Sequence, residues 1–469
     1  MKDKTGVGWG STDPFFLFFL TFDFLYLIEY TGLSDGLIAR LLISLFIDMV
    51  NKTKSIREYE QMTLAMLRAE ANKIGLEDFM ELQKRELMIE ILKKSTSDEG
   101  FVFVDGILEA QKDGSHGVLR TDGLLPGDND VYVSGSQIKK FSLRNGDVVA
   151  GPARLPKDKE KYLSLLRVDT VYGKPAAEAA NRPQFMKMTP IFPNRQIKLE
   201  TTPDVVSTRV IDLLSPIGFG QRSMIVSPPK AGKTWLLKDI ADGIAANNPQ
   251  AKLIVVLVGE RPEEVTDMKR FVKGEVYASN FDELPEQNCR VAEMALQKAM
   301  CMVEWGEDVI ILMDSITRLA RAYNITMPTS GKTLSGGFDP VALYPPKRFF
   351  GAARNFEEGG SLTIIATALV ETGSRMDDLV YEEFKGTGNM ELHLDRALAN
   401  KRIYPSIDVT KSGTRNEELL LGKEVLNQSW RIRRMLELLD QNENPTEVLV
   451  SRLKKTKSNE EFLATLHEA

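Results

Sequence analysis

Four short runs of Val, Ile and Leu alternate with helical patterns in the second half of the chain. They are RSMIVS at 222–227, KLIVVLVGE at 252–260, DVIILMDS at 308–315 and SLTIIATALVET at 361–372. Strands that are apolar along their whole length are typical of a parallel sheet with helices on both faces. The pattern therefore predicts an α/β domain, which we bound at residues 201–469.

The sequence pattern is different between residues 98 and 173, where short runs of alternating apolar and polar residues are separated by Gly, Asp, Asn and Pro. The runs are FVFVDGILEA at 101–110, HGVLR at 116–120, DVYVSGSQI at 130–138, DVVAGPA at 147–153 and YLSLLRVDTV at 162–171. Five short strands at this spacing predict a small all-β barrel of the OB or cold-shock-like type. The next segment, 174–200, begins with KPAAEAANRPQF and is interpreted as a linker.

Apolar residues recur at helical spacing between residues 56 and 94, with charged residues opposite them. This periodicity predicts a small N-terminal helical unit at residues 49–97. Its apolar face is formed by Leu76, Phe79, Leu82, Leu87 and Ile91.

Residues 1–48 form an apolar N-terminal extension that is unlike the rest of the chain. Charged residues interrupt it, among them Asp23, Glu29 and Arg40, so no run reaches the roughly 18 uncharged residues of a membrane span. A small-residue cleavage site does not follow, which argues against a signal peptide. We interpret Met49 as the natural start, with the upstream residues outside the working protein; the alternative is a membrane or partner anchor.

Composition adds a local rather than a global signal. The 469 residues are 43% hydrophobic and 27% charged, with a formal net charge of −6, so the bulk charge does not favour nucleic acid. Residues 137–161 nevertheless hold seven Lys or Arg against three Asp or Glu, a net of +4. Beside Tyr132 and Tyr162 this segment predicts a groove for single strands, where rings stack on bases and cations follow phosphates. The alternative is an ordinary solvated face.

Cysteine and histidine usage narrows the chemistry. The two cysteines, Cys289 and Cys301, have no zinc-like spacing and are typical of a reducing compartment. With three histidines scattered along the chain, a histidine-based metal centre is not expected.

The stretch SPPKAGKTW at 227–235 fits the phosphate-loop pattern G-x-x-x-x-G-K-[ST] except at its first position, which is Ser227. It follows an apolar strand and opens an amphipathic helix, so backbone N–H groups and the helix N-terminus would face an anion. We expect an ATP site in which Lys233 reaches the β- and γ-phosphates and Thr234 binds Mg²⁺. A second GKT at 331–333 follows no strand and is not expected to bind phosphate.

Two apolar strands end in acids. Asp314 is the last residue of the apolar run VIILMD, and we expect it to hold the magnesium shell. Glu260 closes a strand that we expect to neighbour the phosphate-loop strand, and its carboxylate can orient and deprotonate the attacking water. The alternative for Glu260 is an acid that opens a helix before Pro262. Arg261 lies where a phosphate or base contact is plausible.

Long motifs carry a resemblance to the bacterial transcription termination factor Rho family. They include GERPEEVTDM at 259–268, DVIILMDSITRLARAYN at 308–324, SGKTLSGG at 330–337 and YEEFKGTGNMELHL at 381–394, and the similarity runs from about Ile74 to the C-terminus. The resemblance implies a cytoplasmic homohexameric ring of RecA-like motors, each with an RNA-binding barrel, that moves 5′→3′ along RNA. The implied partners are the single-stranded nascent transcript, the RNA polymerase elongation complex and other copies of the chain, with no membrane partner.

The resemblance also implies roles at the nucleotide site. Glu260 would be the catalytic carboxylate, and Tyr404 would stack on adenine opposite Trp235. Arg415 would be an arginine finger for the neighbouring subunit, and Arg402 a second interfacial arginine. The implied nucleotide-binding residues are Gly218, Phe219, Gly220, Gln221, Arg222, Ser223, Lys230, Ala231, Gly232, Lys233, Thr234, Trp235, Arg261 and Tyr404.

RNA contacts are implied in the pore and on the barrel. Lys332 matches the Q loop and ETGSRM at 371–376 matches the R loop, with Arg375 where lysine is common. The barrel segment GSHGVLR departs from the family pattern G-[FY]-G-F-L-R, because His116 and Val118 replace stacking rings while Arg120 is kept. We expect weaker or less pyrimidine-selective RNA binding, unless Val118 is simply a strand residue. The implied RNA-binding residues are His116, Val118, Arg120, Tyr132, Lys161, Tyr162, Lys332, Thr372 and Arg375.

These features favour an ATP-dependent, RNA-stimulated 5′→3′ RNA translocase or helicase that terminates transcription, using ATP and Mg²⁺. One alternative is another RecA-like hexameric motor, of the DNA recombinase or rotary ATP-synthase type. A second is a nucleic-acid-binding module without catalysis. The barrel and the SGKTLSGG loop argue against the first alternative, and Glu260 with Lys233 argues against the second.

Overall fold

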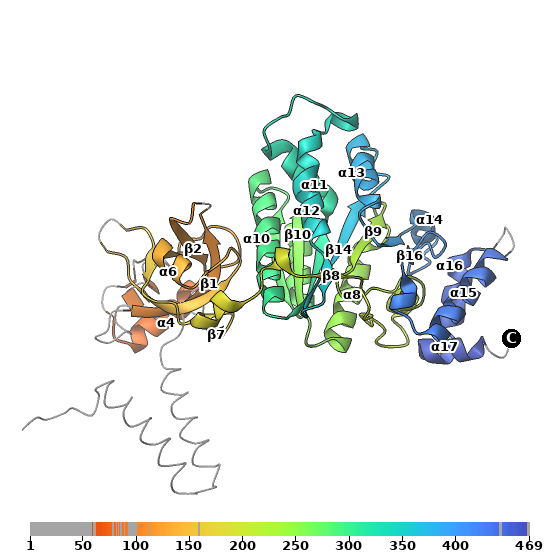
Figure 1. The fold of residues 1–469 in the computed structure, drawn as a ribbon, viewed down its shortest axis with the longest axis horizontal. Coiled ribbons are helices and arrows are strands. Elements are labelled where there is room, and N and C mark those ends of the chain that lie inside the picture. Colours follow the sequence, from red (N-terminus) through yellow and green to blue (C-terminus); the bar gives the residue numbers. More distant parts are fainter. Residues whose placement is uncertain are drawn as a thin grey trace, which may run out of the picture. The chain divides into compact units, whose positions relative to one another are not determined.

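The barrel is a ring of five strands. The computed structural model describes residues 101–466 except 112, 158–159 and 440–442, together with part of the segment 59–91, and all of these belong to the unit Ser55–Ala469. Strands β1 (Phe101–Ala110), β2 (His116–Arg120), β3 (Val131–Ser134), β5 (Leu163–Leu165) and β4 (Val148–Arg154) pair in that order. Antiparallel pairing of β4 with β1 closes the ring, which confirms the predicted barrel (Figure 1).

Two predicted strand runs are only partly extended. The run 130–138 continues as helix α6 (Gly135–Lys140), because Ser134 and Gln137 form a capping box that satisfies the first free backbone N–H groups of the helix. The run 162–171 divides into β5 and β6 (Thr170–Val171), and β6 pairs with β4 and with β7 (Lys174–Pro175).

The segment predicted as a linker is more regular than expected. It begins with β7 and continues as the 3-10 helices η1 (Ala176–Asn181) and η2 (Phe185–Lys187). Ala176, Ala179 and Phe185 are buried, so these side chains fasten the segment to the folded chain. The domain boundaries drawn from the sequence remain predictions.

The N-terminal helical unit is described in part. Helix α4 (Leu64–Lys73) begins after Thr63, whose side chain accepts from the Met66 N–H, and it buries Leu67 and Ala71. Of the predicted apolar face, Leu87 and Ile91 are buried, and the other three residues pack against the same core as the barrel. The predicted extension at 1–48 lies outside the described residues.

The second sheet has nine strands and a parallel centre. Its main path is β11 (Glu275–Asn280), β10 (Lys252–Glu260), β12 (Asp308–Asp314), β14 (Ser361–Leu369), β9 (Arg222–Ser227), β15 (Met390–His393) and β16 (Gly413–Thr414). Every neighbouring pair from β11 to β15 is parallel. Off this path, β13 (Arg354–Phe356) pairs antiparallel with the start of β14 and with β8 (Pro190–Ile191). The four predicted apolar runs are β9, β10, β12 and β14.

Helices cover both faces of this sheet (Figure 1). Alternate residues of β10 belong to different cores: Ile254 and Val256 to one, Val255 and Leu257 to the other. One core includes residues of α10 (Pro285–Glu304), α11 (Ile316–Thr326), α12 (Tyr344–Gly351) and α13 (Arg375–Lys385). The other includes residues of α7 (Val206–Leu214), α8 (Lys233–Asn247), α9 (Pro262–Phe271), α15 (Lys423–Glu437), α16 (Pro445–Leu453) and α17 (Asn459–Thr465).

One expectation about the sheet is wrong. Glu260 was expected on a strand next to the phosphate-loop strand, but β12 and β14 lie between β10 and β9. A crossover helix such as α8 can carry the chain past two strand positions, and adjacency in the sequence does not fix adjacency in the sheet. Within the described part of the chain, no helix combines the length and apolar composition that a membrane crossing requires.

Candidate nucleotide and RNA sites

The phosphate loop joins β9 to α8 and has the expected geometry. The left-handed positions are Lys230, with φ 64°, and Gly232, with φ 90°, whereas Ser227 does not have a positive φ. Serine can therefore replace the first glycine of the pattern without backbone strain. Helix α8 begins at Lys233 and is 15 residues long, so its N-terminal N–H groups can face an anion at the loop.

Three predicted groups converge beside this loop. The Lys233 Nζ lies 2.5 Å from an Asp314 carboxylate oxygen and 3.3 Å from a Glu260 oxygen. Both acids are 3% exposed, and Asp314 also accepts from the Thr367 hydroxyl at 2.7 Å. The ends of β10 and β12 and the start of α8 thus form one polar cluster, although β10 and β9 are not neighbours.

The contacts within this cluster shift the pKa values of Glu260 and Lys233. Burial, followed by the negative charge of Asp314, raises the pKa of Glu260 to about 7 against the opposing charges of Lys233 and Arg318. A carboxyl group with a pKa near neutrality is suited to accept a proton from water. Burial alone would lower the pKa of Lys233, but the two carboxylates outweigh it and the pKa is raised, so the ammonium stays charged.

The donors for a divalent cation are oxygens. Asp314 supplies a buried carboxylate and Thr234 a hydroxyl at the start of α8, and Mg²⁺ prefers such oxygen ligands together with substrate phosphates. Among the residues that the structure describes, no group of three or more His, Cys, Asp or Glu could hold a metal ion. The residues present therefore fit an ion held partly by the nucleotide.

A cavity of about 720 Å³ is lined in part by the phosphate loop, and we call it the base cavity because the two predicted base-stacking residues line it. Trp235 and Tyr404 both line it, and their side chains are 74% and 45% exposed, so their rings have free faces. Lys230 and Arg402 line it as well, which places Arg402 at the nucleotide cavity of its own chain. Other lining residues could not be predicted because no local motif marks them, among them Asp204, Ser207, Asp239 and Lys454.

Residues 218–223 lie elsewhere. They lead into the start of β9, whereas the phosphate loop follows its end, about 17 Å away at the usual rise per strand residue. Gln221 and Arg222 instead line a separate cavity of about 240 Å³ with Arg415. Residues 218–223 therefore lie apart from the phosphate loop of their own chain, and their contact with a nucleotide remains a prediction.

Two more predicted residues do not line the base cavity. Arg415 lines the 240 Å³ cavity and its backbone N–H donates to the Asn389 carbonyl at 2.9 Å. Arg261 precedes α9 with an exposed side chain 3.9 Å from Glu264. Neither lines the cavity of Trp235 and Tyr404.

The two loops predicted to touch RNA carry exposed cations. Lys332 and Arg375 are exposed, and Arg375 is the first residue of α13. Asp339 braces the first loop by accepting from the Ser330 N–H at 2.6 Å and hydroxyl at 2.8 Å. The Thr372 hydroxyl donates to Asp377 at 2.5 Å, so it fixes the second loop to α13.

Helix α11 connects both loops to Glu260. Arg318 lies 3.5 Å from the Glu260 carboxylate, and Arg321 donates to Asp377 at 2.7 Å. Asn324 accepts from the Asp339 N–H at 2.8 Å. Residues spaced by three lie on neighbouring turns of one helix, so α11 joins the acid cluster to the bases of the two loops.

The barrel presents a ring pair on adjacent strands. His116 on β2 stacks with Tyr132 on β3, with centroids 5.7 Å apart and planes at 20°. Val118 lies directly opposite Tyr132 in the register, and the Lys161 ammonium lies 5.1 Å from the Tyr162 ring. These residues remain predicted RNA contacts.

Arg120 differs from its barrel neighbours. It is 7% exposed and its guanidinium pairs with Asp130 and, at 2.6 Å, with Glu109. The opposite charges of two carboxylates hold the side chain buried, so an RNA contact would require those ion pairs to open; Arg120 remains a predicted contact.

Comparison with known proteins identifies both domains. The model of the "ATP synthase alpha/beta family, nucleotide-binding domain" matches residues 207–414, and that of the "Rho termination factor, RNA-binding domain" matches residues 104–177. The transcription termination factor Rho of Bacillus subtilis is 54% identical over 89% of this chain and 97% of its own length. Those of Thermotoga maritima and Pseudomonas aeruginosa are 52% and 50% identical, each over 88% of this chain and over 96% and 99% of their own lengths. The chain belongs to the Rho family of transcription termination factors.

Proposed function

We propose that the chain, an RNA-dependent ATPase of the Rho family with an RNA-binding and an ATPase domain, moves 5′→3′ along nascent RNA and releases it from RNA polymerase. The observation that carries the proposal is the convergence of Lys233, Glu260 and Asp314, in which Glu260 also lies beside Arg318 of α11, the helix that contacts both predicted RNA loops. The motor acts where transcripts are made, in the cytoplasm.

The cluster can perform hydrolysis as follows. Lys233 binds oxygens of the β- and γ-phosphates at the N-terminus of α8, while Trp235 and Tyr404 enclose the base. Glu260 orients a water molecule and accepts its proton during attack on the γ-phosphate. Mg²⁺, which Thr234 and Asp314 would hold, supplies neutralisation of the phosphate charge.

Coupling to RNA passes through α11. A strand that binds Lys332 and Arg375 would displace the loops whose bases are tied to Asn324 and Arg321. Because Arg318 lies one turn earlier, beside Glu260, a movement of α11 changes the position of the catalytic carboxylate. Hydrolysis is thereby faster when the pore is occupied.

The placement of Arg415 supports a ring. This residue does not line the base cavity of its own chain and lies with the start of β9. An arginine there can stabilise the transition state only of a neighbouring subunit's ATP. We therefore propose a homohexamer in which each site is completed by the next copy.

The proposal is tested by the ATP hydrolysis rate without polymer, with poly-C RNA and with single-stranded DNA. Strong stimulation by RNA is expected, because the pore loops act on Glu260 through α11. Stimulation by DNA alone would favour a recombinase-type motor. Absence of hydrolysis under all three conditions would favour a binding module without catalysis.

Val118→Phe is expected to tighten binding of poly-C RNA by the full chain. An added ring opposite Tyr132 can stack on a base, and one such stack contributes about 1–3 kcal/mol, or about 5- to 150-fold in affinity. Fluorescence anisotropy with labelled oligo-C measures the dissociation constant. Val118→Ile is the control, since it adds bulk without a ring. Equal affinities of the parent and Val118→Phe would show that this position does not contact bases.

A further inference from the structure

We propose that Lys454 is a contact for the base and ribose half of the nucleotide, and that the buried Arg209 positions it there. The inference rests on the proposed ATPase site and adds to it a residue from the C-terminal helices. Lys454 follows α16 directly and lines the same cavity as Trp235 and Tyr404.

The Lys454 side chain is available for a ligand. It is exposed at the cavity and forms no ion pair with the residues that the structure describes. Ribose hydroxyl oxygens and adenine ring nitrogens are acceptors, and an ammonium group is a donor with three N–H bonds. Asp204 and Asp239 also line the cavity, so a cation there offsets negative charge close to a polyanionic ligand.

Arg209 fastens the turn in which Lys454 lies. Its Nη1 donates at 2.8 Å to the Leu453 carbonyl, immediately before Lys454, and at 2.8 Å to the Thr456 carbonyl, two residues after it. Its Nη2 donates to the Thr456 hydroxyl at 2.8 Å. The residue is 0% exposed, so removing the guanidinium leaves these buried acceptors without their donor.

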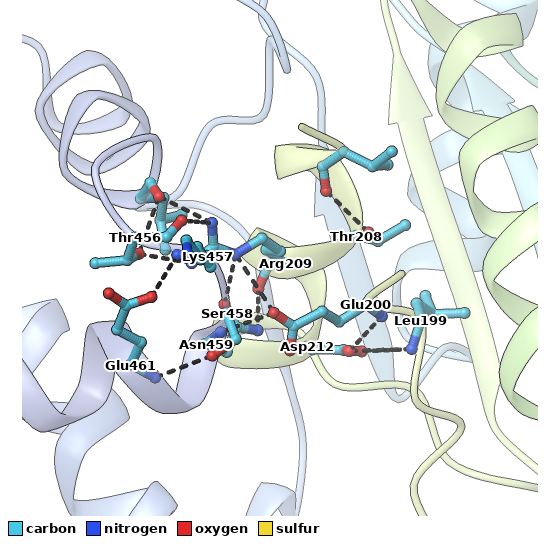
Figure 2. Close-up of polar contacts among 12 residues, drawn as sticks. Leu199, Glu200, Thr208, Arg209, Asp212, Thr456, Lys457, Ser458, Asn459 and Glu461 are labelled. Carbon is cyan, nitrogen blue, oxygen red and sulfur yellow. Dashed lines mark hydrogen bonds and ion pairs between the residues drawn. The ribbon is translucent and has the colours of Figure 1, made fainter. Parts of the chain in front are cut away.

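A second set of contacts fixes the start of α17, which follows this turn, as Figure 2 shows. The Arg209 Nε donates to Asn459 at 3.2 Å, and Asn459 donates back to the Arg209 carbonyl at 3.1 Å. Asp212, one turn further along α7, accepts from the Leu199 and Glu200 N–H groups at 3.0 and 2.8 Å. Glu200 in turn accepts from the Asn459 N–H at 2.7 Å.

Helix α7 therefore carries two parts of the cavity. Its N-terminal end supplies the lining residues Val206 and Ser207, and Arg209 on its next turn holds the α16–α17 turn with Lys454. This arrangement positions a residue of the C-terminal helices against a cavity that is otherwise lined by residues of the segments 204–239 and 394–406. Arg209 is a positioning residue and does not itself line the cavity.

Lys454→Met tests the contact. The dissociation constant of ADP, measured by calorimetry, and KM for ATP are both expected to rise about tenfold, with kcat unchanged, because a charge-assisted hydrogen bond to the nucleoside is lost. Inorganic tripolyphosphate, which has no base or ribose, is expected to inhibit the parent and the variant equally. Lys455→Met is the matched control: it removes the same charge one residue away, outside the cavity lining, and should bind ADP like the parent.

Arg209→Met tests the positioning. At temperatures below its unfolding midpoint, Arg209→Met is expected to raise KM for ATP as Lys454→Met does. The double variant should bind ATP no more weakly than Lys454→Met alone, since both changes remove the same contact. Thr456→Val, which removes only one acceptor of Arg209, is the milder variant should Arg209→Met not fold.

The outcomes separate the two levels of the proposal. A parent that binds ADP, with unchanged affinity in Lys454→Met, overturns the nucleotide contact and leaves the ATPase intact. Equal weakening for ADP and tripolyphosphate overturns the assignment to the nucleoside half. A parent that binds neither ATP nor ADP contradicts the proposed function, and with it this inference.

Discussion

Glu260→Gln is expected to lower kcat for RNA-stimulated ATP hydrolysis by about 10²- to 10⁴-fold, the range for loss of a general base. KM for ATP should change little, because the amide keeps the size of the carboxyl group and the phosphate loop is untouched. Steady-state rates with saturating poly-C RNA measure both constants. Glu263→Gln is the control, since this acid is exposed on α9 three residues away.

A small effect of Glu260→Gln would support the alternative in which this acid only opens a helix before Pro262. The geometry argues against that alternative. Glu260 is 3% exposed and lies within 3.5 Å of two cations, Lys233 and Arg318, whereas a helix-opening acid is normally solvated. A pKa of about 7 also places its proton exchange near neutral pH.

Arg415→Ala is expected to lower the hydrolysis rate by about 10³- to 10⁵-fold, as for loss of an arginine finger. Binding of ADP in the base cavity should persist, because Arg415 does not line it. The rate with poly-C RNA measures the loss, and Arg396→Ala is the control, an exposed arginine at the start of α14 (Arg396–Asn400).

Rings assembled from two variants test whether Arg415 acts on the ATP of a neighbouring subunit. In mixed rings of Arg415→Ala and Glu260→Gln subunits, some sites combine an intact Glu260 with an intact Arg415 of the next copy, so activity should reappear. Pure rings of either variant should stay inactive. If subunit exchange is verified and activity does not return, Arg415 does not act in trans.

The convergence of the proposed catalytic groups could be predicted from the sequence because it depends on local patterns. An apolar strand followed by an acid places that acid at the carboxyl edge of a parallel sheet, where ligands bind, so Asp314 and Glu260 lie together without knowledge of strand order. Strand order itself could not be predicted: β12 and β14, from much later in the chain, insert between β9 and β10.

Contacts between distant segments account for the other differences between the sequence-based predictions and the structure. Nothing local shows that Arg120 forms a buried ion pair with Asp130, or that residues 218–223 lie at the start of β9 while the phosphate loop follows its end. Likewise, Lys454 reaches the base cavity only through the packing of α16 and α17 against α7. Each depends on tertiary packing, which periodicity and motifs do not encode.

Release of RNA from stalled RNA polymerase complexes, with ATP present, most directly tests whether hydrolysis at the Lys233–Glu260–Asp314 cluster powers termination. The fraction of transcript set free should be high with the parent chain and should fall to the level without added protein with Glu260→Gln. Equal release by the parent and Glu260→Gln would contradict a role for this cluster in driving termination.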